Sequence, residues 1–322
     1  MEKKLINTHD KFFKSLFSRK KDLREFVSKT ISPEIVKNLK LDTLILDKTE
    51  YLDKHLRTSY SDLVYNCRYG NSTNVKISLL FEHKSQPELF PHFQLIGYML
   101  SVWGVQIKQK QNLTVVIPII FYHGKKEWQN KPFEAYFNNI DEELKKYIPS
   151  FDYELIDTST YSDKELVGLF ESLELQIGLL VMKNIFNEQE IIRKLSSIFV
   201  SLNQVLQTEQ GRHFFDTIIT YMLNATSIDT NKYLETMRNI SEQAEQQFVS
   251  TATMLRREGI QEGIQEGMKK GMEKGLEKGL EKVALKLIEN GYDNQIIIEI
   301  TNLSVEKIEQ LRKYKTGKGK NN

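Results

Sequence analysis

The 322-residue chain is long enough to bury one large hydrophobic core and to carry at least one appended module. Lys and Arg number 45 against 43 Asp and Glu, so the net charge of +2 excludes a globally basic protein, and any surface for nucleic acid must be local. The single cysteine, Cys67, excludes an internal disulfide, and no stretch reaches the roughly 18 uninterrupted apolar residues of a membrane span, so we expect a cytoplasmic protein with no membrane partner.

The first elements in chain order are a helix and a β-hairpin. Apolar residues recur at helical spacing from about residue 10 to residue 30, and Asp10 is placed to cap the start of that helix. Residues 41–46 are interpreted as an irregular stretch. Two strand-like runs follow at 61–69 and 74–84, and the Gly and Asn residues between them are typical of a hairpin turn.

A second helix and two further strands complete this part of the chain. Pro91 suits the first turn of a helix over residues 91–109. The apolar stripe of this helix consists of Phe93, Ile96, Leu100, Trp103 and Ile107. Residues 115–121 are almost wholly apolar, as in a central strand covered on both faces, although Pro118 requires a bulge or an unpaired position. With a last strand at 151–159, the order predicts an α/β fold with a mixed sheet flanked by helices.

The rest of the chain is predicted to be helical. We assign residues 1–160 to the α/β core and 161–250 to a helical extension packed on that core. Residues 251–282 hold a repeat of period four, interpreted as a helix or a linker, and 283–314 form a small helical module with a pattern like a helix-turn-helix. Residues 315–322 are a polar, basic tail that we expect to be disordered.

Charged residues gather where the second strand of the hairpin ends. Alternation along a strand puts Glu82 and Lys84 on one face and His83 on the other. Asp62 interrupts the first hairpin strand, and pairing of the two strands would bring it close to Glu82. Two neighbouring carboxylates repel each other unless a proton or a cation lies between them, and their oxygen atoms suit Mg²⁺ or another divalent cation. Lys84 would then stabilise the charge that develops on an attacked phosphate.

Further residues are candidates for the same site. Gln94, in the first turn of the following helix, can add a side-chain amide at the same rim. Asp10 is interpreted first as a helix cap and second as a metal ligand. His83 is interpreted as a packed or hydrogen-bonded side chain whose backbone carbonyl can also reach the metal. His123 follows a strand and could line the site, but it is interpreted first as a turn residue. The histidines are too scattered for a zinc site.

The triplet Glu82-His83-Lys84 is a weak signal by itself, because Glu143-Leu144-Lys145 has the same pattern on a predicted helix and charged runs are usually solvated surface. The wider motifs are more specific. They are HDKFFKSLF from His9, YSDLVY from Tyr60, LLFEHKS from Leu79, QLIGYM from Gln94 and VVIPIIFYHG from Val115. Together they resemble the Rpn family of recombination-promoting nucleases, a transposase-like family of the PD-(D/E)xK nuclease superfamily, over about residues 9–158.

The resemblance implies a restriction-endonuclease-like fold and Mg²⁺-dependent cleavage of DNA with low sequence specificity, linked to recombination, mobile elements or phage defence. Matched position by position, it implies Asp62 and Glu82 as the metal-binding carboxylates, Lys84 as the motif lysine and Gln94 as the glutamine of the following helix. Ser61 stands where the general motif has Pro, which weakens the match to that motif. The alternative is a noncatalytic DNA-binding or oligomeric regulator that keeps the fold.

The repeat indicates a protein partner. Its glycines stand at positions 259, 263, 267, 271, 275 and 279, each followed by Ile, Met or Leu. In a helix each glycine costs about 0.5 to 1 kcal/mol relative to Ala, which close contact with another helix can offset. We therefore expect a homo-oligomer through the repeat and the C-terminal module, with a flexible linker as the alternative. The module itself can contact DNA or pack against protein.

Overall fold

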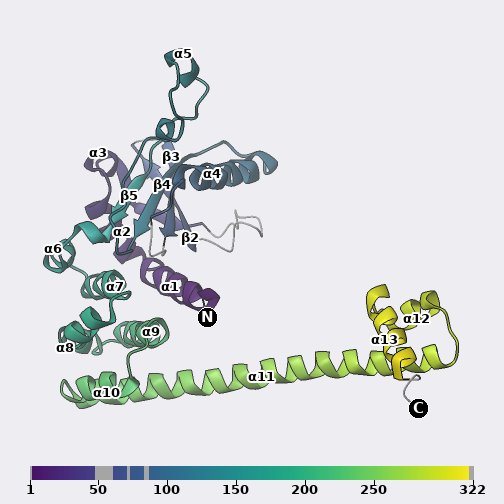
Figure 1. Cartoon of the computed structure of the whole chain (residues 1–322). Helices are drawn as coiled ribbons and strands as arrows, with labels where there is room; N and C mark the ends of the chain where they lie inside the picture. The colour runs from purple at the N-terminus through teal and green to yellow at the C-terminus, as the bar shows by residue number, and fades with distance from the viewer. Residues whose placement is uncertain (1, 48–60, 71–72, 83–86, 319–322) are drawn as a thin grey trace. The chain divides into compact units, whose positions relative to one another are not determined.

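The computed structural model describes residues 2–47, 61–70, 73–82 and 87–318, and it divides into two compact units, Met1–Ala252 and Thr253–Asn322. In the first unit five strands form one sheet in the order β1-β2-β3-β4-β5 (Figure 1). The strands are β1 Leu39–Leu46, β2 Ser61–Tyr69, β3 Thr73–Glu82, β4 Val115–Tyr122 and β5 Glu154–Asp157. The first three strands pair antiparallel, and β3, β4 and β5 pair parallel. The predicted α/β class is confirmed, and the sheet is mixed.

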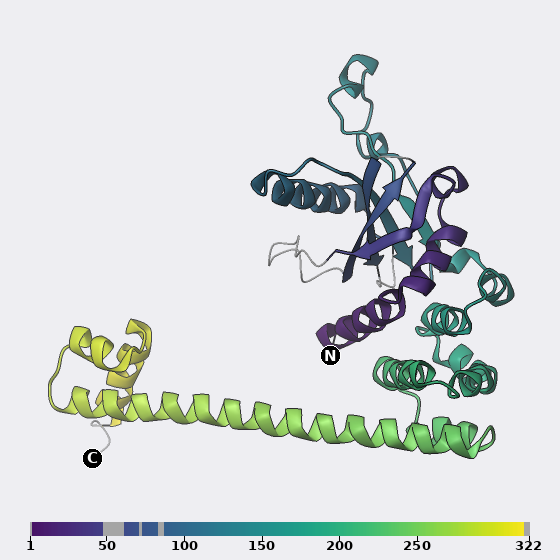
Figure 2. The same ribbon diagram turned by 180° about the vertical axis from the view of Figure 1, so that it is seen from behind.

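Helices cover both faces of the sheet, as Figure 1 and the view from behind in Figure 2 show. The helices of the α/β part are α1 Glu2–Phe17, α2 Lys20–Thr30, α3 Pro33–Val36, α4 Pro91–Lys108 and α5 Glu142–Lys145, with 3₁₀ turns η1 Phe133–Tyr136 and η2 Thr158–Thr160. Along β2, Leu63, Tyr65 and Cys67 pack into the larger core with α1 and α2. Val64 packs on the opposite face, in a smaller core with α4. The alternation of buried residues therefore assigns each helix to a face.

The central strand β4 is buried on both faces, as its apolar sequence predicts. Ile119 and Phe121 belong to the core with α1, and Ile120 belongs to the core with α4. The ladder between β3 and β4 passes through Ser78 and Pro118 without a shift. Pairing between β4 and β5 begins only at Ile119. Pro118, which has no N–H to donate, therefore pairs with Ser78 of β3 without the predicted bulge, and the predicted unpaired position holds only on the β5 side.

The single helix predicted over residues 10–30 is wrong, because the structure has two helices there. The carbonyl oxygen of Phe17, at the end of α1, accepts a hydrogen bond of 2.7 Å from the Tyr65 hydroxyl of β2. A side chain from the sheet thus satisfies a terminal carbonyl and lets the chain turn into α2. The prediction that Asp10 caps a helix is also wrong. Asp10 lies within α1 and pairs with Lys14, one turn later, at 3.3 Å.

The irregular stretch predicted for residues 41–46 is wrong as well, because these residues belong to strand β1. The register of β1 with β2 shifts between Lys40, opposite Arg68, and Ile45, opposite Asn66. Four residues of β1 therefore face one residue of β2, which is a bulge that breaks the period-two pattern. For this reason the strand is hard to recognise from sequence.

Pro91 lies in the first turn of α4 as predicted, but only Ile96 and Trp103 of the predicted apolar stripe pack against the core. The apolar side chains of Leu95, Tyr98, Met99 and Val102 are buried. Three members of the predicted stripe, Phe93, Leu100 and Ile107, are 49%, 59% and 63% exposed. The helix contains no Asp, Glu, Lys or Arg before Lys108, so hydrophobic spacing alone does not select one of its faces.

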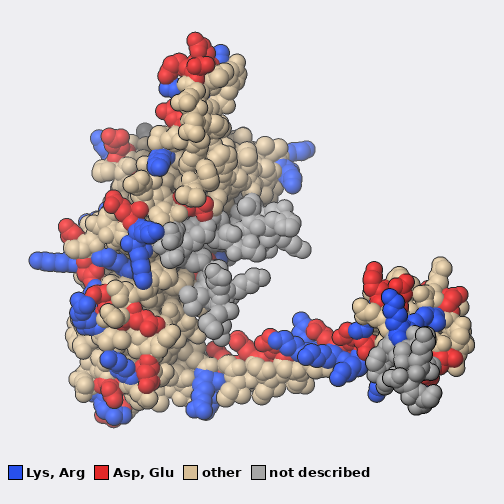
Figure 3. Space-filling model, in the orientation of Figure 1, with Lys and Arg blue, Asp and Glu red and all other residues tan. Residues whose placement is uncertain are grey.

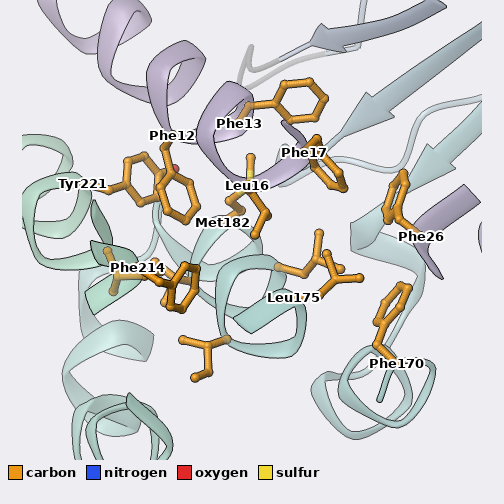
Figure 4. Close-up of a cluster of buried hydrophobic side chains, with 14 of the residues drawn as sticks. Phe12, Phe13, Leu16, Phe17, Phe26, Phe170, Leu175, Met182, Phe214 and Tyr221 are labelled. Carbon is orange, nitrogen blue, oxygen red and sulfur yellow. The ribbon is translucent and has the colours of Figure 1, made fainter. Parts of the chain in front are cut away.

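The helical half of the first unit shares the larger core with the sheet. It contains α6 Asp163–Gly168, α7 Leu173–Asn184, α8 Glu188–Val205, α9 Glu209–Ala225, α10 Thr230–Arg238 and the start of α11 Glu242–Glu289. Phe12 of α1 stacks on Tyr221 of α9 with ring centroids 4.2 Å apart, and Leu175 and Met182 of α7 fill the space beneath α1 (Figure 4). Among the described residues no helix is long and apolar enough to cross a membrane.

The second unit contains the later part of α11, with α12 Asn294–Thr301 and α13 Val305–Lys318. The six repeat glycines all lie within α11, which is helical throughout. Ala284, Ile297 and Ile308 form a small core between the three helices. Two boundaries differ from the prediction. The first helix of the C-terminal module is continuous with α11, and α13 runs to Lys318, so that residues 315–318 are helical.

Candidate functional site

The backbone register brings the two predicted carboxylate positions close to each other. In the antiparallel pair of β2 and β3, Asp62 is the partner of Leu80, two residues before Glu82. In the parallel pair of β3 and β4, Glu82 is the partner of Tyr122. Position 62 lies at the beginning of β2 and position 82 at the end of β3. Because the two strands run in opposite directions, the start of β2 and the end of β3 lie side by side, and both positions are at the same end of the strand pair.

Both positions also belong to one face of the sheet. Directly paired residues, and residues two apart on one strand, share a face. Ile120, the β4 partner of Leu80, and Tyr122, the β4 partner of Glu82, both pack into the core beneath α4. The register therefore assigns positions 62 and 82 to the α4 face. The side chains of Asp62 and Glu82, and the whole of His83 and Lys84, lie outside the described residues, so their roles stay predictions.

The remaining predicted residues lie on different helices. Gln94 is half-buried in the first turn of α4, beside the buried Leu95, on the helix that covers the face of positions 62 and 82. Asp10 lies on α1, which packs against the opposite face of the sheet. Gln94 therefore lies on the same side of the sheet as the two carboxylate positions, whereas Asp10 lies on the opposite side.

The donor chemistry of positions 62 and 82 suits a hard divalent cation, since both side chains offer carboxylate oxygens. Elsewhere, in the part of the chain whose side chains the structure describes, no group of three or more His, Cys, Asp or Glu residues could hold a metal ion.

Two histidines flank the motifs and are buried, which the sequence did not indicate. The prediction that His123 is a turn residue is wrong, because it is 1% exposed and its Nδ1 lies 2.9 Å from the Met182 carbonyl of α7. His9 of α1 is also 1% exposed, with its Nδ1 2.7 Å from the Tyr221 hydroxyl of α9. The two imidazole centroids are 5.6 Å apart. These contacts join the end of β4 to the helical half of the unit.

A second feature lies where α4 begins. His92 is buried among aromatic rings, and its Nδ1 lies 2.8 Å from the Tyr136 hydroxyl of η1. Burial lowers the pKa of His92, and the nearby Asp152 partly opposes that change. Beside this pair is a cavity of about 260 Å³. It is lined by Pro87, Glu88, Leu89, Pro91, Glu127, Gln129, Lys131, Tyr136 and Tyr153. The aromatic residues of "PELFPHF" and "KPFEAYF" were the only sequence signal of this feature.

The family model described as "Putative transposase, YhgA-like" matches residues 7–213 of the chain. The matched segment contains the whole sheet, α4 and much of the helical half of the first unit. The chain therefore belongs to this family.

Individual relatives carry nuclease names. An "Inactive recombination-promoting nuclease-like protein", RpnE of Escherichia coli K12, is 25% identical over 304 residues, which cover 92% of this chain and 94% of the relative. The recombination-promoting nuclease RpnD of Escherichia coli O157:H7 is 24% identical over 67% of this chain and 79% of its own. The recombination-promoting nuclease RpnA of Escherichia coli K12 is 24% identical over 77% of this chain and 87% of its own length. The resemblance to the Rpn family is confirmed, and no solved structure matches the chain.

Proposed function

We propose that this chain is a divalent-metal-dependent DNA endonuclease of low sequence specificity, with a role in recombination, mobile elements or phage defence. The observation that carries the proposal is the register of Asp62 opposite Leu80, which puts two acidic positions on neighbouring strands, on one face and at one edge of the sheet. The nuclease names of the relatives RpnD and RpnA support the same activity. A restriction-endonuclease-like arrangement of the sheet is part of the proposal.

Each residue has a distinct task in this proposal. Asp62 and Glu82 would hold Mg²⁺ or another divalent cation, with the His83 backbone carbonyl and Asp10 as further candidate ligands. When bound, such a cation polarises a phosphate oxygen and lowers the pKa of a coordinated water. Lys84 would place a positive charge beside the phosphate, where charge increases in the transition state. Gln94 would orient a polar group at the same rim from α4.

The activity can be tested by the nicking of supercoiled plasmid in Mg²⁺. We expect Asp62→Asn, Glu82→Gln and Lys84→Met each to lower the rate by about 100-fold or more, as removal of a group that stabilises transition-state charge does. The matched control is Glu143→Gln, because Glu143-Leu144-Lys145 has the same acid-x-Lys pattern on the exposed helix α5. This variant should cut like the wild type. Equal cutting by all four variants, or none by the wild type with any divalent metal, would overturn the assignment.

A noncatalytic role is the second candidate, and one comparison favours it. RpnE, whose alignment covers 92% of this chain, is named an inactive nuclease-like protein. If the wild-type chain binds DNA but does not cut it in any divalent metal, this second candidate replaces the first.

We also propose that the chain self-associates through α11. Ile260, Ile264, Met268, Met272 and Leu276 are each more than half exposed. A Cβ added to any of the six repeat glycines meets nothing within 4 Å, so this row is open to a second helix. Rows of residues four apart pack against each other at a crossing angle of roughly −40° to −50°. A second copy of the chain fits, because acidic and basic rows both repeat along the segment and can pair between copies.

A further inference from the structure

Exposed aromatic rings adjoin the cavity at the start of α4. Phe90, Phe93 and Phe137 are 50%, 49% and 44% exposed. The centroids of Phe90 and Phe93 are 6.1 Å apart, and both rings pack against Tyr136, at 5.2 and 5.8 Å. Tyr136 also lines the cavity. We call Phe90, Phe93, Tyr136 and Phe137 the aromatic shelf, which shares Tyr136 with the cavity lining.

The cavity itself has an unsatisfied polar group. Tyr153 is 7% exposed. Its hydroxyl has no hydrogen-bond partner of normal geometry among the described residues. Burial raises the pKa of Tyr153 to about 12, and the Trp128 side chain beside it acts in the opposite direction. The Trp128 indole can only donate, so the phenolic proton of Tyr153 has no acceptor there.

The charges of the cavity do not suit a phosphate. Its described lining residues include the carboxylates of Glu88 and Glu127 and, as the single cation among them, Lys131. Acidic and basic side chains also lie side by side at the neighbouring tip that carries α5 (Figure 3). Two carboxylates would repel a phosphate, but they accept hydrogen bonds from amino groups, as Glu and Asp do from the amino group of cytosine. The Gln129 amide in the same lining can both donate and accept.

We propose that the aromatic shelf and the adjoining cavity bind unpaired bases of single-stranded nucleic acid, with a base that carries an amino group in the cavity. Exposed rings stack on bases whose faces are free, and such faces are hidden in an intact duplex. A volume of about 260 Å³ is at the small end for ligand sites, and it suits a base more than a helix of a protein partner.

The position of this surface links it to the candidate carboxylates. Pro87, in the cavity lining, follows Glu82 by five residues, which span at most about 18 Å when fully extended. Pro87 therefore lies within about 18 Å of Glu82, which puts the cavity within reach of the same bound strand. The inference rests on the proposed DNA substrate and narrows it to single-stranded or locally opened DNA.

The test measures binding without catalysis. Short fluorescent oligonucleotides of dC, dA and dT, and a matched duplex, are titrated with the full-length chain in EDTA and followed by anisotropy. We expect single strands to bind more tightly than the duplex, and dC and dA more tightly than dT. Phe90→Ala and Phe93→Ala should each weaken single-strand binding roughly tenfold. Glu127→Gln should reduce the preference for dC and dA over dT, since it replaces a carboxylate that only accepts by an amide that also donates.

The matched control is Leu100→Ala, which truncates another apolar side chain of α4 that is 59% exposed but lies outside the shelf. It should bind like the wild type, and circular dichroism checks that every variant folds. Equal single-strand binding by the Phe93→Ala variant and the wild type overturns the inference. If Phe93→Ala changes the molecular mass in solution and leaves oligonucleotide binding unchanged, the rings belong to a protein interface and the inference is also overturned. Plasmid nicking in Mg²⁺ is measured separately. If the wild type nicks plasmid but the Phe90→Ala and Phe93→Ala variants bind single strands as tightly as the wild type, only this inference is refuted and the proposed function stands.

Discussion

The triplets Glu82-His83-Lys84 and Glu143-Leu144-Lys145 share the acid-x-Lys pattern but have different surroundings. Glu82 ends a strand inside a five-stranded sheet, two residues beyond the partner of Asp62. Glu143 lies on a helix of four residues, next to Glu142, whose carboxylate pairs with Lys145 at 2.6 Å. A single residue therefore gains a candidate role from the strand opposite it. At the start of α4, burial lowers the pKa of His92 below that of an exposed histidine.

We predict that His92 makes the stability of the fold depend on pH. Its pKa in the folded state is lowered from 6.5, chiefly by burial, so the unfolded state takes up a proton first as the pH falls. Stability should be complete above about pH 6.5 and should decrease as the pH falls toward the lower folded value. Urea unfolding above and below that pH measures the change.

His92→Gln should weaken this pH dependence, because the amide does not titrate and can still bond to the Tyr136 hydroxyl. The matched control is His213→Gln on α9, where the histidine is exposed. This control should keep the pH dependence of the wild type. If the His92→Gln variant keeps it as well, another group is responsible.

The helical glycines of this chain differ in what surrounds them, since Gly178 is closely packed and the glycines of α11 are not. A Cβ added to Gly178 of α7 would come within 2.9 Å of Leu16, so this glycine allows α1 and α7 to approach closely. The glycines of α11 have open space around them in the single chain. A row of residues that weakens a helix and has no contact within the chain is what a surface for a second helix requires.

We predict that Gly271→Ala combined with Gly275→Ala shifts the chain toward the monomer. Each added methyl group would hold two α11 helices apart, although Ala favours an isolated helix by about 1 kcal/mol over Gly. Sedimentation or light scattering over a range of concentrations measures the shift. The matched control is Gly104→Ala on α4, which also has nothing within 4 Å and lies outside the repeat. An unchanged mass in the double variant, with higher helix stability, would instead indicate an unpaired helix.

At the scale of the whole molecule, the sheet and the helical half of the first unit are one folding unit. A single large core contains Phe121 of the sheet, Phe13 and Leu16 of α1, and Leu175 of α7. Figure 4 shows side chains of α1, such as Leu16, together with Met182 of α7 and Tyr221 of α9. The polar contacts from His9 to Tyr221 and from His123 to Met182 cross the same boundary.

We predict that a fragment of residues 1–252 folds cooperatively and that a fragment of residues 1–160 does not. The shorter fragment would expose the apolar side of α1 and leave the buried His9 and His123 in contact with water. Thermal unfolding by circular dichroism and binding of a hydrophobic dye distinguish the two fragments. A sharp transition in the 1–160 fragment would show that the α/β part is independent of the helices.

Local patterns predicted those parts of the fold and of the candidate site that depend on neighbours along the chain. The hairpin followed from the turn residues, and its pairing from Tyr69 to Asp62 agrees with the predicted strands. Ser304 accepts a hydrogen bond from the Lys307 N–H at the start of α13, as serine before a helix commonly does. The alternation along β3 also assigned Glu82 to one face before its partner strand was known.

The sequence by itself determined the α/β class, the hairpin, the buried central strand and the family, because periodicity, turn residues and motifs are local properties of the chain. Only the tertiary structure decided which face of α4 is buried, where α1 ends and that the bulged β1 is a strand. Those outcomes depend on residues far apart in sequence, such as Tyr65 bonding to Phe17. The cavity beside α4 has the same origin, since Pro87, Tyr136 and Tyr153 meet only after the loop beyond β4 folds back on the helix.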